Sequence, residues 1–281
     1  MGTWTMWTRG VRNIDLPART ARYSGRMAGD HLHFDRVAAL YHAARPAYPA
    51  ALYDQLEAWG ALRPGMTVLE LGPGTGQATR DLLARGVASI DAVELGDTMA
   101  AYLRRTLPDP RLTVIVGNAH DVRLPDHRYD LAVAATSFHW LDPAVMVPKL
   151  ARATRAGAAL AVWWTLFGDP AHSTPFRTGL RRIEEAHGLV SDRGVAPLQL
   201  HDRTADLQIG GFFGDVQHAL FRWSVELDAA QATALFGTFP TWAAAGTAVR
   251  EVGELVQHLG GSVTDHFMTA LYGAWRGGRA Q

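Results

Sequence analysis

Hydrophobic and polar residues alternate with two different periods over residues 67–165. Short β-type runs occur at 67–71, 89–95, 112–116, 129–135 and 158–165. Helical patterns fall between some of them, at 77–85, 98–106 and 143–155. Because strands that alternate with helices pair in parallel and are covered on both faces, this pattern predicts a doubly wound α/β fold with a mostly parallel sheet.

The segments on either side of this core do not continue its alternation of strands and helices. Apolar residues at helical spacing over 31–59, interrupted by Pro46 and Pro49, predict two helices before the first strand. After Phe167 the pattern predicts a helix at 176–187, a loop to about 205, a strand at 214–226, helices at 229–236 and 248–259, and a strand at 266–275. We expect residues 1–29 to form an N-terminal arm and 30–281 one domain, with a cap at roughly 168–210 over the carboxyl edge of the sheet.

Composition narrows the function classes. The chain has 281 residues, 48% of them hydrophobic, which is enough for a sizeable core. It carries 27 basic and 27 acidic residues, and this balance argues against an electrostatic nucleic-acid binder or a membrane-surface protein. No apolar run approaches the roughly 20 residues of a membrane span, and residues 1–26 lack the apolar core of a secretory signal. We therefore expect a cytoplasmic protein without nucleic-acid or membrane partners.

Several kinds of chemistry are excluded by the residues that the chain lacks. Without cysteine there are no disulfides, thiolate nucleophiles or cysteine-ligated metals. Lys149 is the one lysine, which excludes most lysine mechanisms. The histidines have no shared metal-ligand spacing, so we expect no metal site; those compared are His120, His127, His172 and His187.

A glycine-rich turn joins the first strand to the following helix, with the sequence Glu70-Leu-Gly72-Pro-Gly74-Thr-Gly76-Gln77. Glycines let the backbone turn sharply and approach a ligand, with helix amides pointing toward it. The frame is G-x-G-x-G rather than the dinucleotide G-x-G-x-x-G, which argues against a pyrophosphate ligand and a nicotinamide oxidoreductase. The Glu70 carboxylate, two residues before the first glycine, suits an ammonium group better than a phosphate.

A second acid extends this interpretation. Glu94 ends the second strand, 22 residues after Gly72, close to the spacing at which a carboxylate accepts both hydroxyls of a ribose. Together Glu70 and Glu94 suit a nucleoside that carries an amino-acid tail, which describes S-adenosylmethionine.

From about Asp30 to its end, the chain resembles the class I S-adenosylmethionine-dependent methyltransferases. Beyond the glycine loop, the matching motifs are Gly117-Asn118-Ala119, Tyr129-Asp130 and Thr136-Ser137-Phe138-His139-Trp140. The segment with Phe34-Asp35, Tyr41, Arg45-Pro46 and Tyr48-Pro49 is similar to that of the type 11, trans-aconitate methyltransferase-like subgroup. The resemblance implies a seven-stranded Rossmann-like sheet and methyl transfer from S-adenosylmethionine to a small molecule, with S-adenosylhomocysteine as product.

Site residues follow from the loop, from strand ends and from this resemblance. The predicted cofactor-binding residues are Tyr41, Arg45, Glu70, Gly72, Pro73, Gly74, Gly76, Gln77, Thr79, Glu94, Leu95, Asn118, Ala119, Thr136, Ser137 and His139. The predicted substrate residues are Trp140, Trp163, Trp164, Phe167 and Phe176, whose aromatic character favours a partly apolar acceptor. Asn118 stands where many family members have Asp; its carbonyl or the Ala119 backbone is expected to contact adenine.

The residue roles leave alternatives open. His139 is either a general base, the one catalytic candidate, or a side chain that packs against the cofactor or Trp140. Tyr41 and Arg45, one helical turn apart, either close over the cofactor or belong to a surface cap. Of Trp163 and Trp164, at most one faces the substrate, because neighbouring strand residues point to opposite sides.

The activity itself has competing interpretations. The acceptor atom can be a hydroxyl, carboxylate, amine or carbon, in a small molecule of secondary metabolism. An S-adenosylmethionine-using cyclase or lyase and a non-catalytic S-adenosylmethionine-binding regulator share the same motifs. We expect a monomer or a homodimer.

Overall fold

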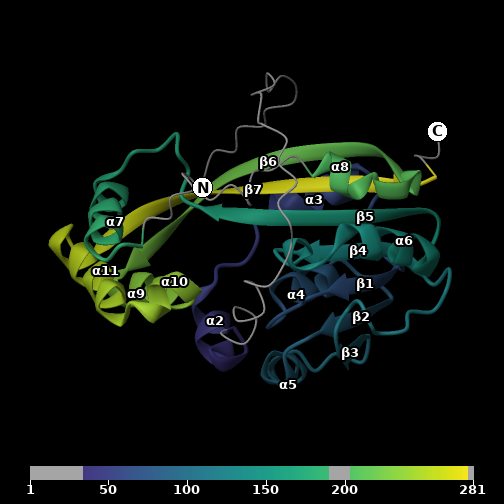
Figure 1. Cartoon of the computed structure of the whole chain (residues 1–281), viewed down its shortest axis with the longest axis horizontal. Coiled ribbons are helices and arrows are strands. Elements are labelled where there is room, and N and C mark those ends of the chain that lie inside the picture. Colours follow the sequence, from purple (N-terminus) through teal and green to yellow (C-terminus); the bar gives the residue numbers. More distant parts are fainter. Residues whose placement is uncertain (1–33, 190–202, 278–281) are drawn as a thin grey trace.

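Over the residues that the structure describes, the central sheet has seven strands. The structure is a computed structural model that describes residues 34–189 and 203–277, so the predicted N-terminal arm lies outside the described residues. The strands are β1 (Thr67–Leu71), β2 (Ser89–Glu94), β3 (Leu112–Val116), β4 (Tyr129–Ala135), β5 (Thr154–Phe167), β6 (Phe213–Asp228) and β7 (Ser262–Arg276). Their order is β3-β2-β1-β4-β5-β7-β6, with β7 antiparallel to both β5 and β6 and the other pairs parallel (Figure 1). The predicted doubly wound, mostly parallel fold is confirmed.

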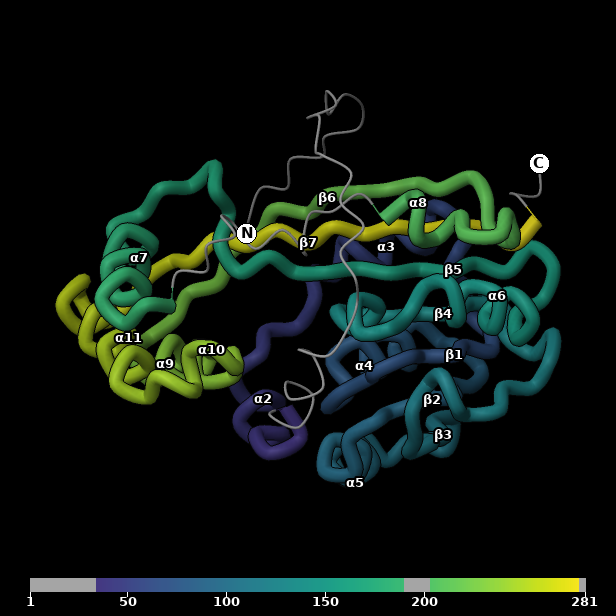
Figure 2. The backbone as a smooth tube through the Cα atoms, viewed as in Figure 1, coloured from purple at the N-terminus to yellow at the C-terminus, as the bar shows by residue number. Residues whose placement is uncertain are grey.

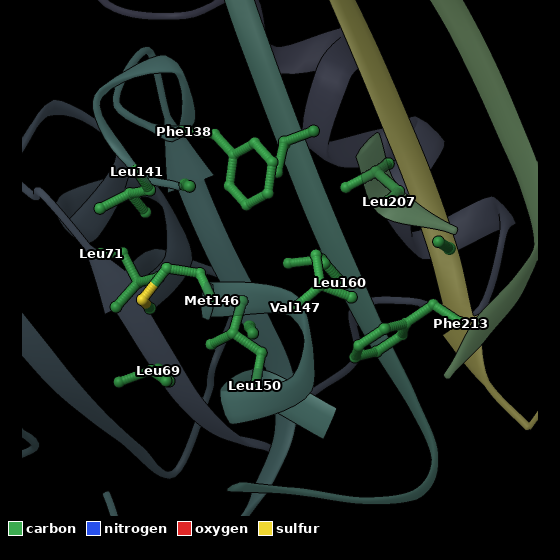
Figure 3. Packing of buried hydrophobic residues seen from close by; sticks show 14 of the residues in the cluster. Leu69, Leu71, Phe138, Leu141, Met146, Val147, Leu150, Leu160, Leu207 and Phe213 are labelled. Atoms are coloured by element: carbon green, nitrogen blue, oxygen red, sulfur yellow. The ribbon is translucent and has the colours of Figure 1, made fainter. Parts of the chain in front are cut away.

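Helices cover both faces of the parallel part of the sheet. They are α3 (Ala50–Ala58), α4 (Gln77–Ala84), α5 (Asp97–Thr106) and α6 (Pro143–Ala153), while α2 (Ala38–Ala44) contacts α5. On one face, Met146, Val147 and Leu150 of α6 pack against Leu69 and Leu160 of the sheet (Figure 3). On the other face, α3 and α4 cover alternate residues of the same strands, among them Val68 and Leu131. The period-2 pattern of each strand therefore supplies two apolar cores.

The strands β5, β7 and β6 are much longer than β1 to β4 and carry a helical subdomain at one end (Figures 1 and 2). Its helices are α7 (Pro175–Ala186), α9 (Ala229–Gly237), α10 (Pro240–Ala244) and α11 (Gly246–His258). They share a third apolar cluster that includes Phe176, Leu235, Trp242 and Phe267. The short helices α8 (Thr204–Leu207) and η2 (Ile209–Gly211) lead into β6 on the α6 side.

The cap differs from the expected segment of roughly 168–210. Of the described residues in that range, only α7 joins the helical subdomain, and most of the subdomain comes from α9–α11, between β6 and β7. The sequence pattern predicted α9 and α11 but not α10, and it did not predict where these helices lie, because their position depends on the long strands β6 and β7 that carry them. No helix of the described segments is long and apolar enough to cross a membrane.

A buried ion pair joins α7 to β7. The Arg177 guanidinium donates to both carboxylate oxygens of Asp265, with Nε 2.7 Å from Oδ1 and Nη2 2.5 Å from Oδ2. The Asp265 side chain is 1% exposed, and burial raises its pKa while Arg177 opposes that effect. Removal of the guanidinium therefore leaves a carboxylate buried without its cation.

We expect Arg177→Met to lower the free energy of unfolding by about 2 to 4 kcal/mol, because the apolar stem is kept while the Asp265 charge loses its partner. Urea denaturation followed by circular dichroism measures this change. Arg181→Met, at an exposed position of the same helix, is the matched control and should change stability by less than about 0.5 kcal/mol. Equal stability of the two variants would contradict the structural role of the pair.

Candidate functional site

A cavity of about 480 Å³ opens at the carboxyl ends of the parallel strands. The strand order reverses between β1 and β4, so the loops after these two strands diverge and leave a crevice. The volume lies within the range of small-molecule sites. The loops after β1, β2, β3 and β4 and the end of β5 all contribute to its wall.

Each glycine of the loop after β1 is required for its own structural reason. All three have left-handed backbone angles, with φ of 65° at Gly72, 59° at Gly74 and 94° at Gly76. A Cβ at Gly72 would lie 2.7 Å from Ser137 Cβ, and one at Gly76 would lie 2.5 Å from Leu103 Cδ1. A Cβ at Gly74 would meet nothing within 4 Å, and Gly74 lines the cavity. Gly74 is therefore where the backbone is open to a ligand, whereas Gly76 serves packing.

The Glu94 carboxylate holds two loops together. Its Oε2 accepts a hydrogen bond from the Gly74 amide and its Oε1 from the Gly96 amide, both at 2.9 Å. The residue is 8% exposed and lines the cavity, and burial raises its pKa against the lowering effect of these amides. Each oxygen has a second lone-pair site, so the carboxylate can still accept hydrogen bonds from a ligand.

Glu70 lies beneath the loop and does not line the cavity. It is 0% exposed; its Oε2 accepts from the Thr79 hydroxyl at 2.7 Å, and its Oε1 has no partner. Because β1 residues alternate between faces, this side chain points toward α4 rather than to the ligand side. Burial raises the pKa of Glu70 to about 7, with a further contribution from the Glu94 charge. The geometry thus departs from the expected direct contact between Glu70 and a ligand ammonium.

The segment before β1 also contributes to the cavity wall. The Asp35 carboxylate accepts from the Met99 amide in the first turn of α5, at 2.9 Å, so an acid from outside the helix caps its N-terminus. The Phe34 ring contacts the Trp140 ring edge-on, with centroids 6.3 Å apart. These contacts fix the segment over the loops after β2 and β4.

Arg45 is a half-buried cation in the cavity wall, and none of the described carboxylates pairs with it. Its guanidinium carbon lies 5.0, 4.7 and 4.2 Å from the ring centroids of Tyr41, Phe167 and Phe239. Its Nε donates to the Thr238 hydroxyl at 2.8 Å, and burial lowers its pKa. No ion pair forms between it and any described acid, so its Nη groups are available to an anionic ligand group.

Thr136, the residue after β4, has a strained backbone, and its hydroxyl pairs with that of Tyr48. Thr136 has φ of 55°, a conformation that a β-branched residue adopts at a cost of about 1 to 3 kcal/mol. Its hydroxyl lies 2.9 Å from the Tyr48 hydroxyl, and burial raises the pKa of Tyr48. Both residues line the cavity, so the strain keeps a pair of neutral hydroxyls at its wall.

Two neighbouring tryptophans of β5 lie on opposite sides. Trp164 lines the cavity, and its indole Nε1 donates to His139 Nδ1 at 2.9 Å. Trp163 lies in the apolar core on the α3 side, against the rings of Tyr48 and Tyr53. Burial, and to a lesser extent the Arg203 charge, lowers the pKa of His139 to about 4.

Most of the residues predicted from sequence surround this one cavity. Those that line it are Tyr41, Arg45, Gly72, Pro73, Gly74, Gln77, Glu94, Leu95, Asn118, Ala119, Thr136, Ser137, His139, Trp140, Trp164 and Phe167. Those that do not are Glu70, Gly76, Thr79, Trp163 and Phe176. Thr79 is occupied with Glu70, and Phe176 faces the core of the helical subdomain because its helix buries that side. These five residues lie outside the cavity lining, and their roles toward a ligand remain predictions.

Other lining residues were not predicted as site residues. Tyr48, Met99, His120, Thr165 and Phe239 are among them. Tyr48 belongs to the quoted Tyr-Pro motif, so a signal for it was present. Phe239 comes from the helical subdomain, and nothing in its local pattern indicates that it meets Arg45. Within the described ranges, no group of three or more His, Cys, Asp or Glu side chains could hold a metal ion.

The pH dependence of stability should report the buried Glu70 carboxyl. Its ordinary pKa is 4.5 and its folded value about 7, so between these values the folded protein keeps a proton that the unfolded chain has lost. The free energy of unfolding should therefore fall as pH rises through this window. In Glu70→Gln the fall should be smaller, by about 2 to 3 kcal/mol between pH 5 and 8.

Urea denaturation at a series of pH values measures this difference. Glu254→Gln, at an exposed position of α11, is the control and should follow the parent curve. Parallel curves for Glu70→Gln and the parent protein would show that Glu70 is ionised in the folded state at neutral pH.

Comparisons with known proteins agree with this architecture. Residues 69–162 match the family model described as a methyltransferase domain. An uncharacterized methyltransferase of Mycobacterium tuberculosis is 35% identical over 133 residues, 47% of this chain and 52% of that protein, so the chain spans about half the length of such curated relatives.

Two solved structures show the same fold. One is a putative type II methyltransferase from Anaeromyxobacter dehalogenans, with a TM-score of 0.61 and 21% identity over 84% of this chain and 99% of that chain. The other is a Haemonchus contortus phosphoethanolamine N-methyltransferase, solved with phosphomonomethylethanolamine and S-adenosylhomocysteine. Its TM-score is 0.51 and its identity 14%, over 89% of this chain and 58% of that chain.

The family match falls on β1 to β5, the strands whose carboxyl ends form the cavity. Over this segment the chain matches a methyltransferase domain, and its described part has the fold of these two structural neighbours.

Proposed function

We propose that this protein transfers the methyl group of S-adenosylmethionine to a small-molecule acceptor. The observation that carries the proposal is the Glu94 carboxylate, buried at the carboxyl end of β2 and joined to the Gly74 amide inside the cavity. A carboxylate in this position is suited to the two hydroxyls of a ribose. The Haemonchus neighbour, solved with S-adenosylhomocysteine on the same fold, supports this choice of cofactor.

Residues of the cavity wall also suit the other parts of the cofactor. The adenine ring fits beside Asn118 and Ala119 after β3, and the ribose fits at Glu94. Arg45, a half-buried cation without an acid partner among the described residues, would hold the carboxylate of the amino-acid tail. The sulfonium methyl would then lie toward the loop after β4, where Thr136 and His139 line the cavity.

Methyl transfer of this kind needs little acid–base chemistry. The acceptor atom attacks the methyl carbon in line with the C–S bond, whose electron pair stays on sulfur. The protein therefore acts mainly by positioning the two molecules and excluding water. Trp140, Trp164 and Phe167 supply apolar surface for the acceptor, which favours a partly apolar small molecule over a macromolecule.

Cofactor binding should depend on Glu94. We expect Glu94→Ala to weaken binding of S-adenosylhomocysteine by about 1 to 3 kcal/mol, or roughly 5- to 150-fold, because charge-assisted hydrogen bonds to two hydroxyls are lost. Isothermal titration calorimetry measures the dissociation constant. Glu226→Ala, at an exposed position of β6, should bind as the parent protein does. An unchanged constant in Glu94→Ala would remove Glu94 from the binding site.

Cofactor binding should also depend on the backbone of the glycine-rich loop after β1. Gly74→Val should abolish binding of S-adenosylhomocysteine, because its side chain would project into the open space at the cavity and would strain a backbone with φ of 59°. Gly188→Val is a matched control, since Gly188 also has a left-handed φ, 63°, with nothing within 4 Å of a Cβ. Circular dichroism should stay native-like in both variants. Retained binding in Gly74→Val would show that the loop does not approach the cofactor.

Transfer of the methyl group distinguishes this proposal from a cyclase, a lyase or a non-catalytic regulator. With methyl-labelled S-adenosylmethionine, a methyltransferase places the label in the acceptor. A cyclase or lyase would return it in the cofactor product, and a regulator would bind the cofactor without turnover.

A further inference from the structure

The hydrogen bond between Trp164 and His139 fixes the tautomer of the histidine. An indole Nε1–H only donates, so His139 Nδ1, which lies 2.9 Å from it, must accept and carry no proton. In the neutral ring the proton is therefore on Nε2. Burial keeps the ring neutral at physiological pH, because it lowers the pKa of His139 to about 4.

Nε2 is the open side of this ring. It has no hydrogen-bond partner among the described residues, and protein atoms do not enclose it. His139 lies on the single turn η1 (Phe138–Trp140) after β4 and lines the cavity together with Trp164. A free N–H is thus available to a molecule in the cavity.

The groups behind His139 strengthen this donor. The Arg203 guanidinium lies over the Trp164 ring, 4.9 Å from its centroid, and Trp164 in turn donates to His139. A cation over an indole face and a hydrogen bond to Nδ1 both draw electron density away from Nε2–H, since successive hydrogen bonds polarise one another. This series of interactions, from Arg203 through Trp164 to His139, favours an electron-rich partner for Nε2–H in the cavity.

His120, which also lines the cavity, uses both of its ring nitrogens in hydrogen bonds within the protein. His120 Nδ1 lies 2.9 Å from Asn118 Oδ1, and its Nε2 accepts from the Asp142 amide at 3.1 Å. Neither His120 nor His139 has a free lone pair toward the cavity, so neither imidazole of the described wall can take a proton from an acceptor.

We propose that His139 is a specificity-determining hydrogen-bond donor, which presents Nε2–H to an unprotonated oxygen of the methyl acceptor. This rests on the proposed function, because it concerns the second molecule in the same cavity. A carbonyl, carboxylate or other anionic oxygen accepts this bond, whereas an ammonium group cannot. The acceptor is then oriented by His139 and is not deprotonated by it.

The tautomer is tested without any ligand. In protein labelled with ¹⁵N-histidine, the His139 signals are assigned by their loss in His139→Gln. At pH 7.5 we expect a protonated Nε2 and an unprotonated Nδ1. In Trp164→Phe, which removes the indole donor, the ring should exchange between both tautomers. A proton on Nδ1 in the parent protein would overturn the proposal.

The ligand preference is tested with two probes of the same shape, phenylacetate and 2-phenylethylamine, on protein saturated with S-adenosylhomocysteine. Phenylacetate should shift the Nε2 signal and 2-phenylethylamine should not. His139→Phe, which keeps an aromatic ring but lacks the N–H, should weaken phenylacetate binding about tenfold or more. His139→Gln, whose amide can donate from a similar place, should stay within about threefold of the parent protein. His258→Phe, at an exposed position of α11, is the control.

Each remaining outcome decides the question. No response of Nε2 to phenylacetate up to tens of millimolar, or equal binding in His139→Phe, would make His139 a packing residue. A shift on adding S-adenosylhomocysteine alone, with no further response to phenylacetate, would assign the bond to the carboxylate of the cofactor and overturn the role toward the acceptor. If S-adenosylhomocysteine itself fails to bind, the proposed function fails, while the tautomer and the phenylacetate response of the ligand-free protein still test His139.

Discussion

The site depends on the Glu94 carboxylate, which accepts amide hydrogen bonds from both the loop after β1 and the turn after β2. Parallel strands bring these two loops to the same edge, but nothing in strand pairing alone fixes the distance between them. An acid with two oxygens does so, at the cost of a buried charge. The same geometry leaves lone pairs directed at the cavity, so one carboxylate both shapes the wall and offers the strongest acceptor in it.

Around this edge, segments remote in sequence meet at single side chains. Arg45 comes from the segment before β1, yet it bonds Thr238 and lies over Phe239 of the helical subdomain. Asp35, from the same segment, caps α5 through the Met99 amide. The cavity is therefore enclosed by contacts between three parts of the chain, and its shape reflects how the long strands hold the helical subdomain beside the parallel sheet.

The sequence predicted the elements well, because most of them follow a clear period. The bounds 67–71, 112–116 and 129–135 match β1, β3 and β4 as the structure has them. Glu94 and Gly74 were also predicted as site residues, and both line the cavity, because strand ends and backbone freedom are local features. Their roles toward a cofactor remain predictions. The trans-aconitate-like subgroup remains a prediction.

What the sequence did not predict depends on contacts between distant segments. Glu70 has the expected neighbours in sequence, but its side chain faces Thr79, and only the packed structure shows which side of β1 is open. The cap was placed too early in the chain, because the helices of 229–258 reach it through the length of β6 and β7. For His139, two roles suited the sequence, and the Trp164 hydrogen bond that separates them joins β5 to the turn after β4.

The position of β7 between β5 and β6 has a consequence for the order of folding. Among the described strands, β6 pairs only with β7, and β7 lies between β5 and β6, although about a hundred residues separate Thr165 from its partner Thr269. During synthesis the parallel strands can therefore assemble early, but β6 must wait for the last strand before it can join the sheet. Closing so long a loop is slow, and the end of β5 that carries Trp164 is held on both sides only after the C-terminal strand has emerged from the ribosome.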